Sequence, residues 1–248
     1  MVSGSAMPAR SVPLDVASAA RSAPAQTRRR RAQREKTERI LAGALEVFSR
    51  RGLEGARLDE IAAACNVSKT NLLYYYPTKA ALYRAALEWL LDKWLAPLRE
   101  IDATRDPDAA LTGYIVRKLA YARSHPAASR LFCQEMLQGA PLLGEVLSGD
   151  LARLVDEKTA VIEGWVRRGL LAPIDPRHLI FAIWATTQHY ADFAVQIAAV
   201  TRQEIDDDAL WEEARRTLLR IFAGLMRPRG QADPPAGCGT QVAFPWQD

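Results

Sequence analysis

The sequence predicts an all-α protein with a small N-terminal helix-turn-helix domain and a larger helical body. Two observations predict this fold. Apolar residues recur at helical spacing over most of the chain, and no run alternates as a half-buried strand does. The segment LDEIAAACNVSKTNLLYYYPTK at residues 58–79 also has the pattern of two short helices joined by a turn. The chain has 248 residues and is 49% hydrophobic, which suits one or two packed domains.

The first helix of the N-terminal domain is expected to begin near Ala32 and to end at Gly52, a residue that suits a helix C-terminus. In the turn between the two short helices, Asn66 tolerates the left-handed backbone that such a turn needs. Ser68 is placed to cap the second short helix, and Pro77 stops it. The domain is therefore predicted to span residues 32–78.

The second short helix is dense in polar and aromatic side chains. A helix-turn-helix places such a helix in the major groove of DNA, where side chains at its start reach base edges. The alternative is a helical hairpin in a protein core, but core hairpins seldom carry so many hydrogen-bonding side chains on so short a helix. We therefore predict that Lys69, Thr70 and Asn71 read bases. The side chains that mark this helix are Lys69, Thr70, Asn71, Tyr74 and Tyr75.

Positive charge is concentrated at the N-terminal end. Residues 1–79 contain 14 Lys and Arg against 7 Asp and Glu, whereas the rest of the chain contains 19 against 22. This asymmetry predicts a nucleic-acid partner at one end only. Residues 1–31 are rich in Ala, Ser, Pro and Arg and are expected to be a disordered basic leader. Its run Arg28–Arg31 either reaches phosphates or the minor groove, or is a solvated tail.

The body is predicted to span residues 79–227 and to precede a flexible tail at 228–248. A long helix from Lys79 through Trp94 towards Pro97 connects it to the N-terminal domain. Asp175 and Pro176 have the pattern of a capped helix start. The remaining helices are expected at 108–124, 127–138, 148–169, 176–200 and 207–226.

The sequence contains no nucleophile–base pair, no phosphate-binding glycine loop and no clustered metal ligands. We therefore expect no enzyme, no cofactor and no metal, and His189 fits a core or surface histidine better than a metal ligand. Cys65, Cys133 and Cys238 do not form a disulfide framework, which fits a reducing cytoplasm. No apolar run approaches the ~20 residues of a membrane span. The body is interpreted as a sensor and dimerisation unit of a cytoplasmic, nucleoid-associated protein.

An N-terminal helix followed by IAAACNVSKTNLLYYYPTKAALY resembles the TetR family of bacterial one-component repressors. The resemblance extends through WLAPL, ASRLFCQEML, GAPLL and APIDPRHLIFAIWATTQHYADFAVQ, over about residues 35–228. These body motifs resemble the branch of the family that represses pyrimidine utilisation genes. The sequence departs from the family pattern at positions that bear on which operator is read. Asn66 and Thr70 replace Gly, Leu73 replaces Tyr, and Arg57 replaces a capping Thr.

The resemblance implies a homodimer that binds double-stranded operator DNA. Its two recognition helices enter successive major grooves about 34–36 Å apart. Tyr75 matches the position at which the family contacts backbone phosphate, whereas Tyr76 matches a core residue. Arg57 and Lys79, at neighbouring helix starts, are further phosphate candidates. For Tyr74, the core and DNA interpretations are evenly balanced.

The resemblance also implies uracil or thymine as the effector. In the helix expected at 176–200, Trp184, Gln188 and Asp192 recur every four residues and share a face. A buried amide or carboxylate must bond to protein or ligand, and a Gln carboxamide can meet a pyrimidine imide edge with one donor and one acceptor. Trp184 or Trp94 could stack on the ring. The predicted ligand residues are Trp94, Arg130, Trp184, Gln188 and Asp192.

Two alternatives stay open at this level. The alternative for the polar residues of the body is a buried structural network, to which Lys118, Glu135 and Lys158 would also belong. The protein itself could instead be a repressor of the same family that senses another hydrophobic compound, or an architectural DNA-binding protein without an effector. In the family, the last two long helices pair with those of the partner as a four-helix bundle, here at 176–200 and 207–226.

Overall fold

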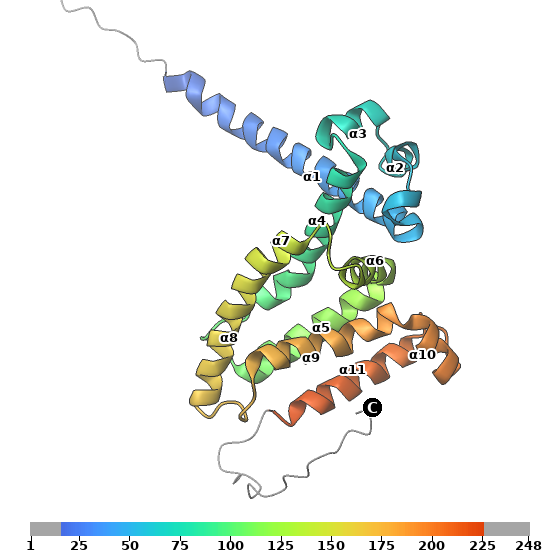
Figure 1. The fold of residues 1–248 in the computed structure, drawn as a ribbon. Helices are drawn as coiled ribbons and strands as arrows, with labels where there is room; N and C mark the ends of the chain where they lie inside the picture. Colours follow the sequence, from blue (N-terminus) through green and yellow to red (C-terminus); the bar gives the residue numbers. More distant parts are fainter. Residues whose placement is uncertain (1–15, 226–248) are drawn as a thin grey trace, which may run out of the picture.

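The computed structural model describes residues 16–225 and the side chains of residues 27–225. Within these residues every regular element is a helix, which confirms the predicted all-α fold (Figure 1). The elements are α1 (Val16–Gly55), α2 (Leu58–Ala64), α3 (Lys69–Tyr75), α4 (Lys79–Arg99), α5 (Pro107–Ser124), α6 (Pro126–Leu137), α7 (Gly144–Val146), the π-helical turn η1 (Leu147–Leu151), α8 (Ala152–Arg167), α9 (Pro176–Asp192), α10 (Ala194–Thr201) and α11 (Asp208–Ala223).

Helices α1, α2 and α3 form the N-terminal domain together with the start of α4 (Figure 1). Asn66 has a φ of 53° and turns the chain between α2 and α3, as predicted. Ser68 Oγ accepts a hydrogen bond from the backbone amide of Asn71 at 3.1 Å, so the predicted cap is confirmed. One apolar core holds the three helices in place. Its fully buried members include Ile40, Phe48, Ile61 and Leu72.

Replacing Ser68 with alanine will lower the free energy of unfolding by about 1 kcal/mol, because the first turn of α3 loses the acceptor for a free amide. Chemical denaturation followed by circular dichroism measures this change. Thr70→Ala is the control, since Thr70 is exposed and lies inside α3 rather than at its cap. An equal loss for the two variants would contradict the capping role of Ser68.

Helix α1 begins at Val16, well before the start predicted near Ala32. The expectation of a disordered leader is therefore wrong for residues 16–31. It rested on a composition rich in Ala, Ser, Pro and Arg without a continuous apolar stretch, but alanine and arginine are strong helix formers and can extend a helix whose other end is packed. Residues 1–15 and the predicted tail at 228–248 lie outside the described residues.

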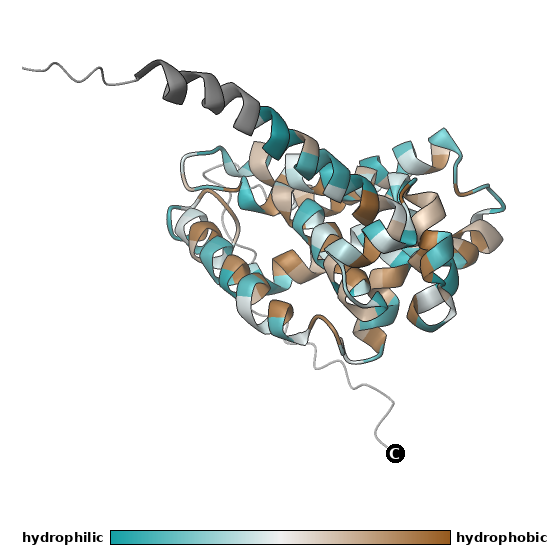
Figure 2. Ribbon diagram, turned by 90° about the horizontal axis from the view of Figure 1, so that it is seen from above, coloured by the Kyte–Doolittle hydropathy of each residue, from teal (hydrophilic) through white to brown (hydrophobic). Residues whose placement is uncertain are grey.

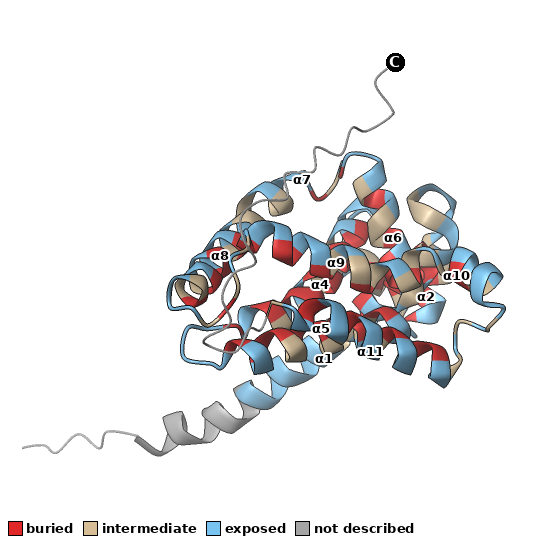
Figure 3. Ribbon diagram, turned by 90° about the horizontal axis from the view of Figure 1, so that it is seen from below, coloured by how far each residue is buried: buried red, intermediate tan, exposed pale blue. Residues whose placement is uncertain are grey.

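The body packs α5 against α9, with α11 along α5 and α8 along α9 (Figure 1). Its helices alternate hydrophobic and hydrophilic stretches (Figure 2), and the buried residues gather where helices face one another (Figure 3). Tyr114 and Trp165 are the largest fully buried side chains of this second core. The body is thus a second packed unit, as the sequence predicts.

Two predicted body helices are interrupted. The helix expected at 176–200 stops at Asp192, because Phe193 has non-helical backbone angles (φ −114°, ψ 31°) and α10 begins beyond it. This break coincides with contacts that Ser129 and Arg130 of α6 make with the last turn of α9. The helix expected at 148–169 starts with the turn η1 instead of regular α-helix. Helical periodicity in the sequence cannot predict these breaks, because it does not depend on contacts between helices.

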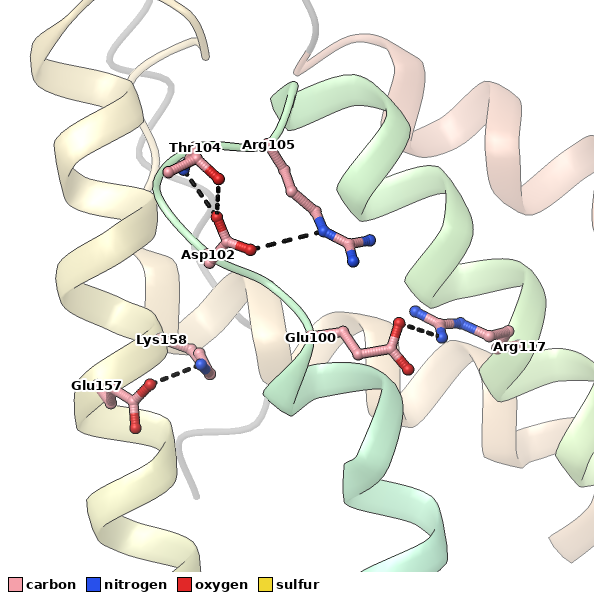
Figure 4. Close-up of polar contacts among 7 residues, drawn as sticks. All are labelled: Glu100, Asp102, Thr104, Arg105, Arg117, Glu157 and Lys158. Atoms are coloured by element: carbon pink, nitrogen blue, oxygen red, sulfur yellow. Dashed lines mark hydrogen bonds and ion pairs between the residues drawn. The ribbon is translucent and has the colours of Figure 1, made fainter.

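One ion pair joins the end of α4 to α5, and another lies within the neighbouring helix α8 (Figure 4). Arg117 Nη1 lies 2.7 Å from Glu100 Oε2. On α8, the buried Lys158 lies with its Nζ 2.6 Å from Glu157 Oε1. Lys158, which the sequence marks as a polar residue in apolar surroundings, therefore has its own anionic partner on the same helix.

Candidate DNA interface and effector pocket

Helix α3 packs on the domain core through one fully buried side chain and exposes several of its polar side chains. Leu72 is fully buried in the N-terminal core, whereas Lys69 and Thr70 are exposed. Tyr74 is 82% exposed, which removes the core interpretation that the sequence left open for it. Tyr76 is half-buried against the core, and burial raises the pKa of its hydroxyl. The outer face of α3 therefore has the composition that groove binding requires.

Two α1 residues join this face, and sequence reasoning missed them as a pair. Lys36 Nζ donates to Asn71 Oδ1 at 3.4 Å and lies 5.1 Å from the ring centroid of Tyr75. The Tyr75 hydroxyl donates to Gln33 Oε1 at 3.3 Å. Gln33 and Lys36 are three residues apart and so share a face of α1. The three-residue spacing is visible in the sequence, but only the packing of α1 across α3 shows that the two side chains contact the recognition helix.

Other predicted DNA residues already have contacts within the protein. Lys79 Nζ donates to the carbonyl oxygens of Glu54 at 3.0 Å and Ala56 at 3.2 Å, which satisfies the end of α1. Binding of a phosphate by Lys79 would require these bonds to break. Arg57 is exposed at the start of α2 and makes no capping hydrogen bond there.

A small cavity of about 40 Å³ lies between α4, α5 and α9, below the roughly 300–1,000 Å³ of ligand pockets, so a bound ligand requires its walls to move apart. Three of the five predicted ligand residues line it, namely Trp94, Trp184 and Gln188. Its other walls are apolar except for one lysine. The full lining is Leu91, Trp94, Leu95, Lys118, Phe132, Leu151, Trp184 and Gln188.

Lys118 is the charged residue of this pocket and is buried. Its Nζ donates to Gln188 Oε1 at 3.4 Å and lies 4.8 Å from the ring centroid of Trp94. Burial lowers the pKa of Lys118 to about 8, and the nearby Asp192 carboxylate opposes this shift. A lysine so placed at a pocket wall is typical of a functional site.

The two tryptophans of the pocket differ in their hydrogen bonding. Trp184 Nε1 donates to the Tyr114 hydroxyl at 2.5 Å, which fixes the indole ring. Trp94 Nε1 is buried and has no hydrogen-bond partner among the described residues. The Trp94 ring packs edge-on against Phe132 at a centroid distance of 5.2 Å. Trp94 therefore offers a donor, and Trp184 offers an apolar ring.

The other two predicted ligand residues do not line the pocket. Ser129 Oγ donates to Asp192 Oδ1 at 2.5 Å, and burial raises the pKa of this carboxyl. Arg130 is exposed, and its Nη1 donates to the Ala191 carbonyl at 3.2 Å. Asp192 and Arg130 therefore connect α6 to the end of α9, as the alternative of a buried structural network proposes for them. Among residues 27–225, no group of His, Cys, Asp and Glu is placed to hold a metal ion.

Residues 40–86 match the family described as "Bacterial regulatory proteins, tetR family", and residues 87–229 match "YcdC-like protein, C-terminal region". The chain is 53% identical to the HTH-type transcriptional regulator RutR of Escherichia coli K12 over 202 residues, which are 82% of this chain and 95% of RutR. No helix in the described range has the length and apolarity to cross a membrane.

Solved structures agree with this fold. A transcriptional regulator of Streptomyces coelicolor, SCO4942, is 29% identical with a TM-score of 0.54, over 77% of this chain and 98% of that one. AibR, solved with isovaleryl coenzyme A and operator DNA, is 18% identical with a TM-score of 0.54, over 78% and 99% of the two chains, and shares the fold. Regulators of this family dimerise, bind operator DNA and respond to small molecules. The chain belongs to the TetR family and is a helix-turn-helix transcriptional regulator, not an enzyme.

Proposed function

We propose that this protein represses genes of pyrimidine utilisation in the cytoplasm and leaves its operator when uracil or thymine enters the pocket between α4, α5 and α9. The pyrimidine assignment rests on the body motifs that resemble the pyrimidine-responsive branch of the family. The observation that carries it is the polar lining of the pocket. Its polar groups are the N–H donors of Lys118, Trp94 and Gln188 and one acceptor, the Gln188 carbonyl oxygen.

The donor character follows from the contact between Lys118 and Gln188. An ammonium group only donates, so the Gln188 atom that faces it must be the oxygen, and the amide nitrogen remains for a ligand. The indole N–H of Trp94 is a further donor. Gln188 can therefore donate through its amide nitrogen and still accept through the second lone pair of its oxygen, which keeps the proposed role as both donor and acceptor. The two carbonyl groups of uracil or thymine can accept hydrogen bonds from these donors. The amino group of cytosine is itself a donor and cannot accept from them.

Helix α4 connects this pocket to the DNA-binding domain. Lys79 at its start bonds the end of α1, and Leu91 and Trp94 further along line the pocket. A ligand that displaces Trp94 thus acts on the element that positions the domain. A preference of ~100-fold for the released conformation provides about 2.7 kcal/mol against operator binding.

Operator release tests the proposal. A duplex selected by the full chain from a random DNA library is bound, and free uracil, thymine or cytosine is titrated in an electrophoretic mobility shift experiment. Uracil and thymine should release the DNA, and cytosine should not, because its amino group is a donor. Absence of release at saturating uracil and thymine would overturn the proposal. Release by acyl compounds alone would support a sensor of another hydrophobic ligand.

We further propose that α9 and α11 form the dimer surface and that residues 32–78 and 79–227 act as reading and sensing domains. Phe181 on α9 is 47% exposed and Ile221 on α11 is 60% exposed. These two side chains lie on the pair of long helices that regulators of the family use to dimerise, and we propose that they pack against the partner.

Replacing both Phe181 and Ile221 with glutamate should give monomers in analytical ultracentrifugation and abolish operator binding, because charges would be buried at the interface. Leu137→Glu is the matched control, since Leu137 is 82% exposed on α6 and lies outside the proposed surface. Dimers of unchanged affinity for the double variant would place the interface elsewhere.

A further inference from the structure

The N-terminal half of α1 carries a run of arginines, Arg28–Arg31, that forms no hydrogen bond or ion pair with α3 in the described part of the chain. Arg28, Arg29 and Arg30 are exposed and form no ion pair within the described residues. Arg31, by contrast, pairs with Glu35 at 2.8 Å, and Arg34 pairs with Glu38 at 3.1 Å. In Figure 1, α1 projects past α2 and α3, and its first described turns are hydrophilic in Figure 2. Arg28, Arg29 and Arg30 thus offer charge that no ion pair among the described residues neutralises.

The contacts between α1 and α3 orient this run. Lys36 touches Asn71, a predicted base reader, and one turn earlier Gln33 touches Tyr75, a predicted phosphate contact. Residues nearer the start of α1 therefore lie beside residues nearer the end of α3. One further turn earlier on the same face is Arg29, because residues four apart lie above one another on a helix.

The distance from Gln33 to Arg29 along the axis is about 6 Å, which corresponds to about two base pairs of DNA. Arg29 therefore lies beyond the end of α3, where the DNA backbone leaves the proposed half-site. Arg31 is two residues further on and points about 200° away from Arg29 around the helix axis. The two arginines consequently face opposite directions.

We propose that Arg29 binds the DNA backbone just outside each half-site, so that α1 and α3 together form a surface longer than the recognition helix. This inference rests on the proposed orientation of α3 on DNA. The partner is duplex DNA, recognised by charge rather than by sequence, because a guanidinium without an ion-pair partner in the described part of the chain can form bidentate bonds with phosphate. The contact extends the site on both flanks of the dimer.

The test compares Arg29→Ala and Arg31→Ala on two duplexes of one selected operator, the first cut at the half-site edges and the second extended by five base pairs on each flank. Wild type and Arg31→Ala should bind the extended duplex more tightly, and Arg29→Ala should lose that gain. Two phosphate contacts per dimer also make the slope of log affinity against log salt about 2 units shallower in Arg29→Ala. That difference amounts to about 12-fold between 50 and 200 mM salt.

Equal salt slopes for the two variants, or no gain from added flanks in wild type, would overturn the flanking contact. Binding of wild type to the cut duplex reports separately on the proposed function. If wild type binds the cut duplex without sequence preference, the proposed orientation of α3 on DNA is wrong, independently of the flanking contact. Circular dichroism of both variants verifies that α1 is unchanged.

Discussion

Lys118→Met will weaken uracil binding by about 10- to 100-fold while operator binding without effector stays at the wild-type level. The loss corresponds to a hydrogen bond to a charged group, worth about 1.5–3 kcal/mol. Methionine preserves much of the length and the apolar stem of lysine, so the pocket walls stay in place. Isothermal titration calorimetry with uracil measures the change, and a mobility shift experiment measures operator affinity.

Lys93→Met is the matched control, because Lys93 also lies against a tryptophan, with its Nζ 5.5 Å from the Trp89 ring, but does not line the pocket. Its uracil affinity should equal that of the wild type. If Lys118→Met binds uracil as tightly as the wild type, the donor role of Lys118 is wrong and the lysine only neutralises Asp192 in the folded body.

The same lysine makes stability depend on pH. Its folded pKa of about 8 lies below the ordinary value near 10.4, so the unfolded chain holds the proton more tightly between these values. The free energy of unfolding contributed by this group therefore rises as the pH increases from about 8 to about 10. In Lys118→Met this rise should be absent, which denaturation at pH 7.5, 8.5 and 9.5 checks. A rise of equal size in both proteins would assign it to another group.

Asn71→Ala will relax sequence preference rather than abolish DNA binding. An asparagine that meets an adenine with two hydrogen bonds contributes about 1–3 kcal/mol of discrimination against the wrong base. Lys36 occupies the Asn71 oxygen at 3.4 Å in the free protein, so this side chain is already oriented at the surface of α3. Fluorescence anisotropy on the selected operator and on a scrambled duplex measures the ratio of affinities, which should fall about 5- to 100-fold.

Tyr75→Phe provides the contrast. Removal of a phosphate contact weakens binding to both duplexes by a similar factor and leaves their ratio unchanged. The phenyl ring keeps its packing against Lys36, so α3 stays in place. Equal losses on operator and scrambled DNA for Asn71→Ala would show that Asn71 also acts on the backbone.

The pocket could be predicted from the sequence only in part. The four-residue spacing correctly brought Trp184 and Gln188 together, because it lies within a single continuous helix. Asp192 shares that spacing but sits in the last turn before the break at Phe193, where Ser129 of another helix binds it. The sequence marks Lys118 as a polar residue of the body but does not place it at the pocket, since 70 residues separate it from Gln188.

The sequence by itself determined the all-α fold, the helix-turn-helix and the family of this protein, because helix periodicity, the Asn66 turn and the Ser68 cap are local properties. Tertiary structure alone decided which polar groups meet. It placed Lys118 against Gln188 and Trp94, and it placed Gln33 and Lys36 against α3. The physical reason is that hydrogen bonds between helices depend on crossing geometry, which side-chain packing sets over the whole core.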